Sequence, residues 1–403
     1  MRWTGLAAAG LAAGTLMGCG ARPLPVGART SHDSAGVEVV ELGPPDTVHQ
    51  QWRVDLSAPL LMLGGSGDGT ELFGKRAPRS AVTLPDGRLI VAFDEAPYLG
   101  AFDSTGRLVS RFGQLGGGPG EFTREPTVLA YGDTIVAEVE LGGLAMVTFF
   151  GPDLKVAQTY HISFPPTPAS EPFPIGVTAK AEIVFRHEYV EDKPGVSRAP
   201  AEILVAPWGG GRAHQVVHFA GEERMALANP MIRNTFLIFG KKSAMTMSGE
   251  RLLSGGNDGF AIDTHDLSGK LIRTLRVELP ATPVTQQMKD GWVADQFIDT
   301  TAETGRLAHL SVETAQYAKE LRAYEGFYPT TDGGIWIERA RLRDGAPHVY
   351  WAFDSTGHFL AATSLPVELK PREIWRDRVM VSGVDADGVP MLAIYRLVPV
   401  VQR

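Results

Sequence analysis

The sequence predicts an all-β fold in which one four-stranded unit occurs six times. Short β-rich runs of about five or six residues, the usual strand length, alternate with turn signals. The pattern returns every 40 to 50 residues or so, which is typical of β-propeller blades. The near copies FDSTGRL at 102–108 and FDSTGHF at 353–359 occupy the same turn of two different units. We therefore predict a six-bladed β-propeller.

The clearest repeat spans residues 83–113, where turn signals at Asp86-Gly87, at 95–97 and at 104–106 separate three β-rich runs. With the run before Asp86 it makes a four-stranded antiparallel meander. The six predicted repeats are residues 83–113, 130–160, 174–219, 244–275, 330–365 and 375–398. Because the last repeat ends near the C-terminus, we expect a strand within residues 36–63 to complete the sixth blade and close the ring, which would remove exposed edges.

The glycine-rich stretch RFGQLGGGPGEF, residues 111–122, is predicted to join two blades. Residues 63–84 contain a similar stretch one blade earlier. Glycines allow the positive φ angles that such a path needs, and Phe122 and Phe73 are expected to pack between adjacent blades. No Gly-Lys-Ser/Thr follows the loop, and a strand rather than a helix comes next. These two features exclude a phosphate loop and a dinucleotide fold.

One segment, about residues 283–327, departs from the β pattern and predicts a helical insertion between blades four and five. Residues 283–297 and 310–327 are rich in helix formers, and Ser311 is a plausible N-cap of the second helix. An insertion between two blades lies on the face where a funnel opens. The pair could form a lid there or fill a gap at the rim.

The N-terminus has the features of an export signal. Residues 1–18 hold Arg2 and a short uncharged apolar run, which is typical of a signal peptide. The tetrapeptide LMGC, ending at Cys19, resembles the lipobox of bacterial lipoproteins. This resemblance implies cleavage before Cys19, lipidation of its thiol, and attachment to a bacterial membrane. Gly20 implies the outer membrane of the cell envelope. Residues 19–35 are expected to be a tether, and residues 36–403 the propeller.

Composition limits the partners of the chain. Forty-six acidic residues against 38 Lys and Arg give a formal charge of −8, which gives no electrostatic support to a nucleic-acid role. Cys19 is the only cysteine, so no internal disulfide can form. Beyond the N-terminus there is no run of 18 uncharged apolar residues. We expect a monomer.

Candidate binding residues lie at the ends of the second strand of each blade, because these ends share one face with the blade-to-blade joints. They are Asp94, Glu95, Glu138, Glu140, His187, Glu188, Asn257, Asp258, Glu338, Arg339 and Asp385. Converging oxygen ligands could hold Ca²⁺, with Glu138, Asn257 and Asp258 as candidates. Turns are also rich in Asp, Asn and Glu for local reasons, so the sequence predicts no certain cofactor and no catalytic residue.

The joint GGGPGEF, the D-G-x-I/L-x-V strands and the F-D-x-x-G-x-L turns resemble six-bladed β-propeller lipoproteins of Bacteroidetes and Gemmatimonas-like bacteria, relatives of NHL-repeat propellers. The resemblance covers most of residues 36–400 and implies a fold and an envelope location. It implies no single activity. Two hypotheses follow: a binding or scaffold module for a peptide, glycan or partner protein, or a Ca²⁺-dependent hydrolase or lyase similar to six-bladed lactonases and strictosidine synthase.

Overall fold

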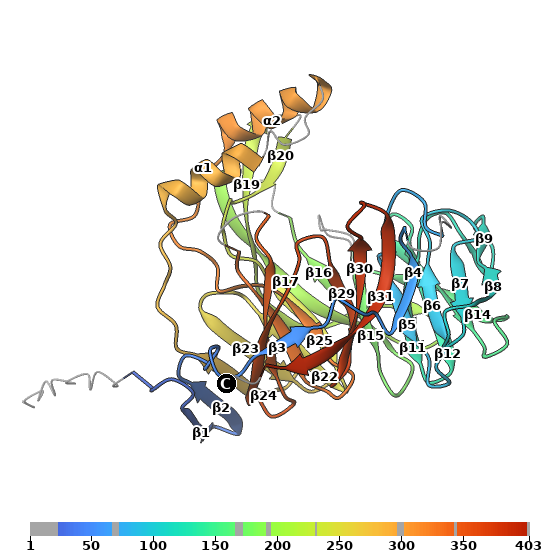
Figure 1. Ribbon diagram of the computed structural model, residues 1–403, viewed down its shortest axis with the longest axis horizontal. Coiled ribbons are helices and arrows are strands. Elements are labelled where there is room, and N and C mark those ends of the chain that lie inside the picture. The colour runs from blue at the N-terminus through green and yellow to red at the C-terminus, as the bar shows by residue number, and fades with distance from the viewer. Residues whose placement is uncertain are drawn as a thin grey trace, which may run out of the picture.

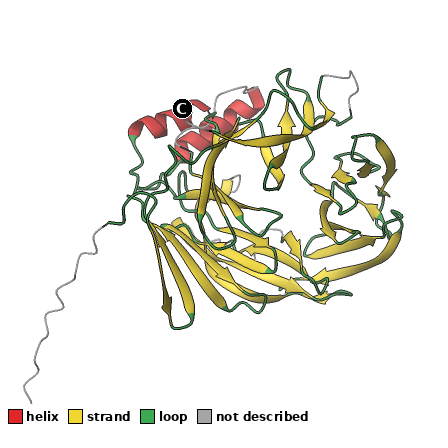
Figure 2. Cartoon of the chain, turned by 60° about the horizontal axis from the view of Figure 1, so that its bottom comes forward, coloured by secondary structure: helices red, strands yellow, loops and turns green. Residues whose placement is uncertain are grey.

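A computed structural model describes residues 23–66, 72–165, 172–190, 195–229, 232–295, 302–341 and 345–400. This part of the chain is all-β apart from two helices, and it contains six sheets of four to six strands (Figures 1 and 2). Each sheet is built on an antiparallel meander, and we number the sheets 1 to 6 in chain order. The predicted signal peptide, residues 1–18, and Cys19 lie outside the described residues.

Sheets 1 to 3 follow the first three predicted repeats. Sheet 1 contains β5 (Ala81–Thr83), β6 (Leu89–Ala92), β7 (Leu99–Phe102) and β8 (Leu108–Phe112). Sheet 2 contains β11 (Thr127–Tyr131), β12 (Thr134–Glu140), β13 (Leu144–Phe150), β14 (Val156–Ser163) and the short β18 (Gly211–Arg212). Sheet 3 contains β15 (Phe173–Val177), β16 (Ile183–Glu188), β17 (Gly195–Ala206), β19 (His214–Asn229) and β20 (Ile232–Phe236).

Sheets 4 to 6 follow the remaining repeats. Sheet 4 contains β21 (Ala244–Ser248), β22 (Arg251–Gly255), β23 (Phe260–His265), β24 (Leu271–Val277), β2 (Val37–Leu42) and β1 (Arg29–Ser34). Sheet 5 contains β25 (Tyr324–Pro329), β26 (Ile335–Arg339), β27 (His348–Phe353) and β28 (Phe359–Leu365). Sheet 6 contains β29 (Lys370–Ile374), β30 (Arg378–Val384), β31 (Pro390–Pro399), β3 (Trp52–Val54) and β4 (Leu61–Gly64).

The repeated turn between third and fourth strands has a clear chemical basis. In sheet 1, the Asp103 carboxylate accepts hydrogen bonds from the backbone N–H groups of Thr105 and Arg107, both at 3.0 Å. In sheet 5, Asp354 accepts equivalent bonds from Thr356 at 2.8 Å and His358 at 2.9 Å. Such side-chain bonds to the backbone explain why Asp starts these turns. The position predicted from the two FDSTG copies is therefore confirmed.

Apolar side chains join each sheet to the next. Six buried clusters lie between sheets 1 and 2, 2 and 3, 3 and 4, 4 and 5, 5 and 6, and 6 and 1. The first strands of the sheets contact one another in the same cyclic order, including β29 of sheet 6 with β5 of sheet 1. Each sheet is thus covered on both faces by its two neighbours in the cycle. Sheet 6, the last in the chain, covers one face of sheet 1.

The glycine-rich stretch 111–122 connects sheet 1 to sheet 2, as predicted. Its short strands β9 (Gln114–Leu115) and β10 (Glu121–Phe122) pair with each other. Phe122 is fully buried in the cluster between these sheets, and Phe73 is buried between sheets 6 and 1. Gly113 has φ +77°, and a Cβ there would lie 2.9 Å from the Phe122 ring. A larger residue would meet both strain and a clash at this position.

The N-terminal strands take two different positions. β3 and β4 pair with β31, which confirms that a strand from residues 36–63 completes sheet 6. β2 instead pairs in parallel with β24 at the outer edge of sheet 4. The irregular tether expected over residues 19–35 is wrong in part, since β1 forms a hairpin with β2. The turn has positive φ angles at Ala35 and Gly36, 55° and 83°, which suit the twist of a two-residue hairpin.

The helical insertion lies between β24 and β25, but its second helix is not where the sequence predicts it. The helices are α1 (Gln286–Asp295) and α2 (Ala302–Thr314). Ser311 lies inside α2 instead of capping a helix over 310–327, and Tyr324 begins the first strand of sheet 5. Burial of Tyr324 and Phe327 against sheet 4 outweighs their neighbours' helix propensity. No helix in the described ranges is long and apolar enough to cross a membrane.

The helices are placed beside the extension of sheet 3 (Figure 1). β17 and β19 continue beyond the length of the other strands, and β20 pairs with the end of β19. The segment after α2 joins this extension, because Ile238 N–H donates to Gln316 O at 2.9 Å and Ala318 N–H donates to Ile238 O at 2.9 Å. The extension of sheet 3 therefore holds the end of the insertion through backbone hydrogen bonds.

Removing the N-terminal strands in two steps tests what completes sheet 6. A chain lacking residues 23–50 loses β1 and β2 and exposes the edge of β24, just as β8 is the edge of sheet 1. We expect it to stay monomeric with a lower melting temperature. A chain lacking residues 23–64 also exposes β31 and the cluster between sheets 6 and 1, and we expect it to aggregate. Size-exclusion chromatography distinguishes the two, and a stable monomer from the longer deletion would contradict the role of β3 and β4.

Candidate functional site

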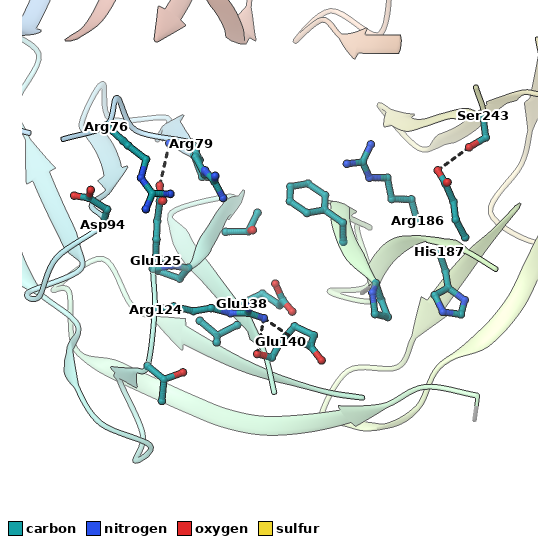
Figure 3. Close-up of a pocket in the computed structure, with 18 of the residues that line it drawn as sticks. Arg76, Arg79, Asp94, Arg124, Glu125, Glu138, Glu140, Arg186, His187 and Ser243 are labelled. Carbon is teal, nitrogen blue, oxygen red and sulfur yellow. Dashed lines mark hydrogen bonds and ion pairs between the residues drawn. The ribbon is translucent and has the colours of Figure 1, made fainter. Parts of the chain in front are cut away.

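A cavity of about 930 Å³ opens at the ends of the second strands of sheets 1 to 3 (Figure 3). It is also lined by the segments that enter sheets 1, 2, 3 and 4, and by Glu222 and Arg224 of β19. The size falls in the range of small-molecule sites. Five predicted residues line it: Asp94, Glu138, Glu140, His187 and Glu188.

The register of sheet 3 places its polar residues at the cavity. Along β16, Arg186 and Glu188 point to one side and His187 to the other, because side chains alternate along a strand. Arg186 pairs with Phe173 of β15, and its guanidinium lies over the Phe173 ring at 4.7 Å from the centroid. His187 pairs with Glu202 of β17. The end of β16 thus contributes a cation to the cavity wall and a buried histidine beside it.

His187 is held inside the sheet. Its Nδ1 lies 2.7 Å from Glu202 Oε1, and both side chains are almost completely buried. The Tyr189 hydroxyl donates to the same oxygen at 2.9 Å. A buried carboxylate needs such partners. The geometry gives His187 a positioning role within sheet 3.

A pair of carboxyl groups lies at the cavity wall formed by sheet 3, Glu188 at the end of β16 and Glu222 on β19. The Ser243 hydroxyl donates to Glu188 Oε1 at 2.6 Å. Arg224 Nη2 lies 3.1 Å from Glu222 Oε2 and 3.7 Å from Glu188 Oε2. Burial, followed by the nearby charge of Glu188, raises the pKa of Glu222 to about 7. Glu222 can therefore hold or release a proton near neutral pH.

Two other cavity acids, Glu140 and Glu325, are engaged in ion pairs. Arg124 Nη2 lies 2.7 Å from Glu140 Oε2. Glu325 lies 3.0 Å from Lys242 Nζ and 2.7 Å from Arg322 Nη2. Burial alone would raise the pKa of Glu325, but these two cations lower it to about 2. Burial raises the pKa of Glu125, which accepts a hydrogen bond from the Arg79 backbone N–H at 2.9 Å.

A second cavity of about 250 Å³ lies against α1. Met288 and Trp292 of α1 line it together with the segment after β20. Lys242 and Glu325 line both cavities. The helical insertion therefore lines a smaller cavity that shares Lys242 and Glu325 with the large one.

Asn257 and Asp258, two of the predicted site residues, have structural roles. The Asn257 side chain is buried, donates to Tyr324 O at 2.6 Å and accepts from Ala323 N–H at 2.7 Å. Asp258 lies 2.6 Å from both Arg198 Nη1 and Lys241 Nζ. Neither lines the large cavity. The structure therefore does not bring the Ca²⁺ candidates Glu138, Asn257 and Asp258 together in this cavity, and the amide of Asn257 binds the backbone at the start of β25.

The remaining predicted residues also lie outside the cavity lining. Glu338 is buried and contacts His348 Nδ1 at 2.5 Å and the Tyr328 hydroxyl at 2.8 Å. Arg339 stacks over Trp351, 4.0 Å from the ring centroid. Asp385 accepts hydrogen bonds from the backbone of Ser66 and Val389 in a turn of sheet 6, and Glu95 is exposed. Within the described ranges, no group of three or more His, Cys, Asp or Glu is arranged to hold a metal ion.

Sequence reasoning missed the basic half of the cavity. Its members are Arg76, Arg79, Arg124, Arg186, Arg224 and Lys242. Arg186 is adjacent to a predicted residue and could have been found from strand alternation. The other five come from segments between sheets or from the extension of β19, which no repeat pattern delimits.

The raised pKa of Glu222 makes stability depend on pH. The folded protein holds this proton more tightly than the unfolded chain, so stability should fall as pH rises from about 4.5 to about 7. Glu222→Gln keeps a hydrogen-bond donor without the charge. We expect its free energy of unfolding, measured in urea at pH 8, to exceed that of the wild type by about 2 to 3 kcal/mol. At pH 4.5 the two should differ little. Glu368→Gln, at an exposed carboxylate before β29, is the matched control. Equal gains from both changes would contradict the assignment.

Comparisons with known proteins give structural similarity only. No protein-family model matches the chain, and no curated protein matches it. A solved member of the DUF4221 family from Bacteroides vulgatus is 9% identical, with a TM-score of 0.49 over 87% of this chain and 100% of that one. A Bacteroides fragilis protein described as exported is 10% identical, with a TM-score of 0.42 over 91% and 100%. A Bacteroides caccae protein of unknown function is 11% identical, with a TM-score of 0.34 over 72% and 86%.

Proposed function

We propose that the chain is a six-bladed β-propeller that serves as a binding or scaffold module in the bacterial envelope. The six antiparallel sheets, their cyclic apolar contacts and the pairing of β3 and β4 with β31 support the fold. Each sheet is one blade in this proposal. The partner is a peptide, glycan or protein.

The observation that carries the binding proposal is the large, polar cavity at one end of the strands. Charged side chains from four sheets converge there, although they come from distant parts of the sequence (Figure 3). A concave site with convergent polar groups is the usual form of a ligand site.

Filling this cavity tests the proposal. Thr123 is exposed at its lining, and Thr123→Trp should occupy part of the space. The full-length protein in detergent is applied to arrays of bacterial glycans and short peptides. We expect a bound class that Thr123→Trp weakens at least tenfold. Thr331→Trp, in an exposed turn at the opposite end of sheet 5, is the matched control. Binding that survives equally in both variants would contradict this site.

A hydrolase or lyase is the second candidate, and the carboxyl pair favours it. Glu222 holds a proton near neutral pH, while Glu188 next to it is stabilised by Ser243 and Arg224. Two carboxyl groups in different protonation states can serve as general acid and base. In this reading the pair would supply acid–base chemistry to the hydrolase or lyase.

We further propose that the propeller is attached to the envelope through lipidated Cys19, and that the membrane is the outer one. The LMGC tetrapeptide and the short apolar run before it support this. Cys19 precedes the first described strand, β1, by ten residues, from 19 to 29. An anchor at Cys19 would leave the sheets free to fold outside the bilayer.

Replacing the single cysteine tests the anchor. Cys19→Ser removes the thiol that lipidation requires, so we expect the protein to leave the membrane fraction or to accumulate unprocessed. Detergent-phase partitioning and the mass of the N-terminal peptide measure this. Ser57→Ala, at an exposed position of the folded part, is the control and should stay membrane-bound. Unchanged partitioning of Cys19→Ser would remove the basis for a lipid anchor.

A further inference from the structure

Three arginines give the cavity a cationic region. Arg76 and Arg79 lie in the segment before β5, and Arg186 is near the end of β16. All three are exposed in the cavity lining. Figure 3 shows Arg79 and Arg186 extending from opposite walls toward the middle of the cavity. Among the described residues, no ion pair joins these three guanidinium groups to a carboxylate, although the charge of Arg79 acts on nearby Glu125 and lowers its pKa against the effect of burial. Their charges therefore remain available to a ligand.

Two acids, Asp94 and Glu125, lie on the same wall of the cavity as Arg76 and Arg79, and four others are engaged elsewhere. Glu140 and Glu325 are paired with Arg124, Lys242 and Arg322. Glu188 is bound by Ser243 and lies near Arg224. Glu222 is protonated in part at neutral pH because it is buried beside Glu188. Three exposed arginines without an ion pair, in a chain of formal charge −8, need a functional explanation.

We propose that Arg76, Arg79 and Arg186 bind a carboxylate of an acidic oligosaccharide. This deepens the binding function proposed above and rests on it. Arginine presents a rigid planar fork that matches a carboxylate with two parallel hydrogen bonds. The two walls of the cavity would thereby hold one ligand between sheets 1 and 3.

The rest of the lining favours a sugar over a peptide. Most of its side chains are charged or carry hydroxyls, such as Ser80, Thr123 and Thr127, which suit the many hydroxyls of a saccharide. Phe173 is 44% exposed, although the Arg186 guanidinium lies over its ring, and it adds an apolar surface beside that arginine for the C–H groups of a sugar. Apolar pockets for peptide side chains are scarce, since the aliphatic residues of the lining are Val139 and two prolines.

The test compares matched probes on the full-length protein in detergent. Trimers of galacturonic, glucuronic and mannuronic acid are titrated by calorimetry, together with their carboxyl-reduced neutral forms and a triglutamate peptide. We expect at least one uronic acid trimer to bind, with affinity that falls as salt is raised. Its neutral form and the peptide should bind at least tenfold more weakly.

Variants connect binding to the arginines. Arg79→Gln and Arg186→Gln should each weaken the uronate trimer at least tenfold, and Arg79→Lys should recover only part of the loss because it keeps the charge without the fork. Arg107→Gln, at an 82% exposed side chain in a turn at the other end of sheet 1, should bind as the wild type does. Thermal melting of every variant verifies that the fold is intact.

The outcomes separate this inference from the proposed function. If no uronate trimer binds, or if the neutral forms or triglutamate bind equally well, the proposal of an acidic saccharide ligand is overturned. The binding function would still stand if an array ligand remained sensitive to Thr123→Trp. Uronate binding that ignores Arg79→Gln and Arg186→Gln would likewise overturn the assignment of the arginines.

Discussion

The packing of each sheet against two neighbours is the constraint on which the rest of the structure depends. A sheet with two apolar faces must cover both, and six clusters between successive sheets do so here. The cluster between sheets 6 and 1 needs a strand that the C-terminal meander lacks. Leu63 of β4, next to Phe73, supplies it from the other end of the chain. The two ends of the folded region are thereby joined through one sheet.

This arrangement also determines where polar groups can gather. The interiors of the sheets and their contacts are occupied by apolar side chains, so buried charges such as Glu202 and Glu338 are tolerated only with histidine and tyrosine partners. Strand ends are free of that restriction. The second strands of sheets 1 to 3 end at one side, where the connections from sheet to sheet also run, and the cavity forms between them.

Much of the architecture could be predicted from the sequence because its signals are local. The DSTG turns, the β-rich runs and the glycine-rich joint each depend on a few adjacent residues, and all lie where they were expected. The predicted range of the second helix was wrong because Tyr324 and Phe327 are held in a strand by contacts with sheet 4. No local sequence pattern reveals these contacts. The parallel addition of β2 to β24 is equally non-local.

The site was predicted only in part for the same reason. Strand ends identified Glu138, Glu140, His187 and Glu188, since their position depends on the repeat. Asn257 occupies an equivalent position by sequence, but its amide forms hydrogen bonds with the backbone at the start of β25. Whether a polar strand end faces a cavity or a neighbouring strand depends on the next sheet in the cycle.

Charge pairing decides what the cavity can do. Most of its acids are held by bases of the same sheet, such as Glu222 by Arg224, and one ion pair also ties two sheets together, Lys242 before β21 with Glu325 of β25. Residues used in this way hold the walls in place and have little capacity left for a ligand. Three groups lie outside these pairs: Arg76, Arg79 and Arg186. They come from the segment before sheet 1 and from sheet 3, and they lie on walls that face each other across the cavity. An anion bound there would complete a contact between sheets that the protein alone leaves open.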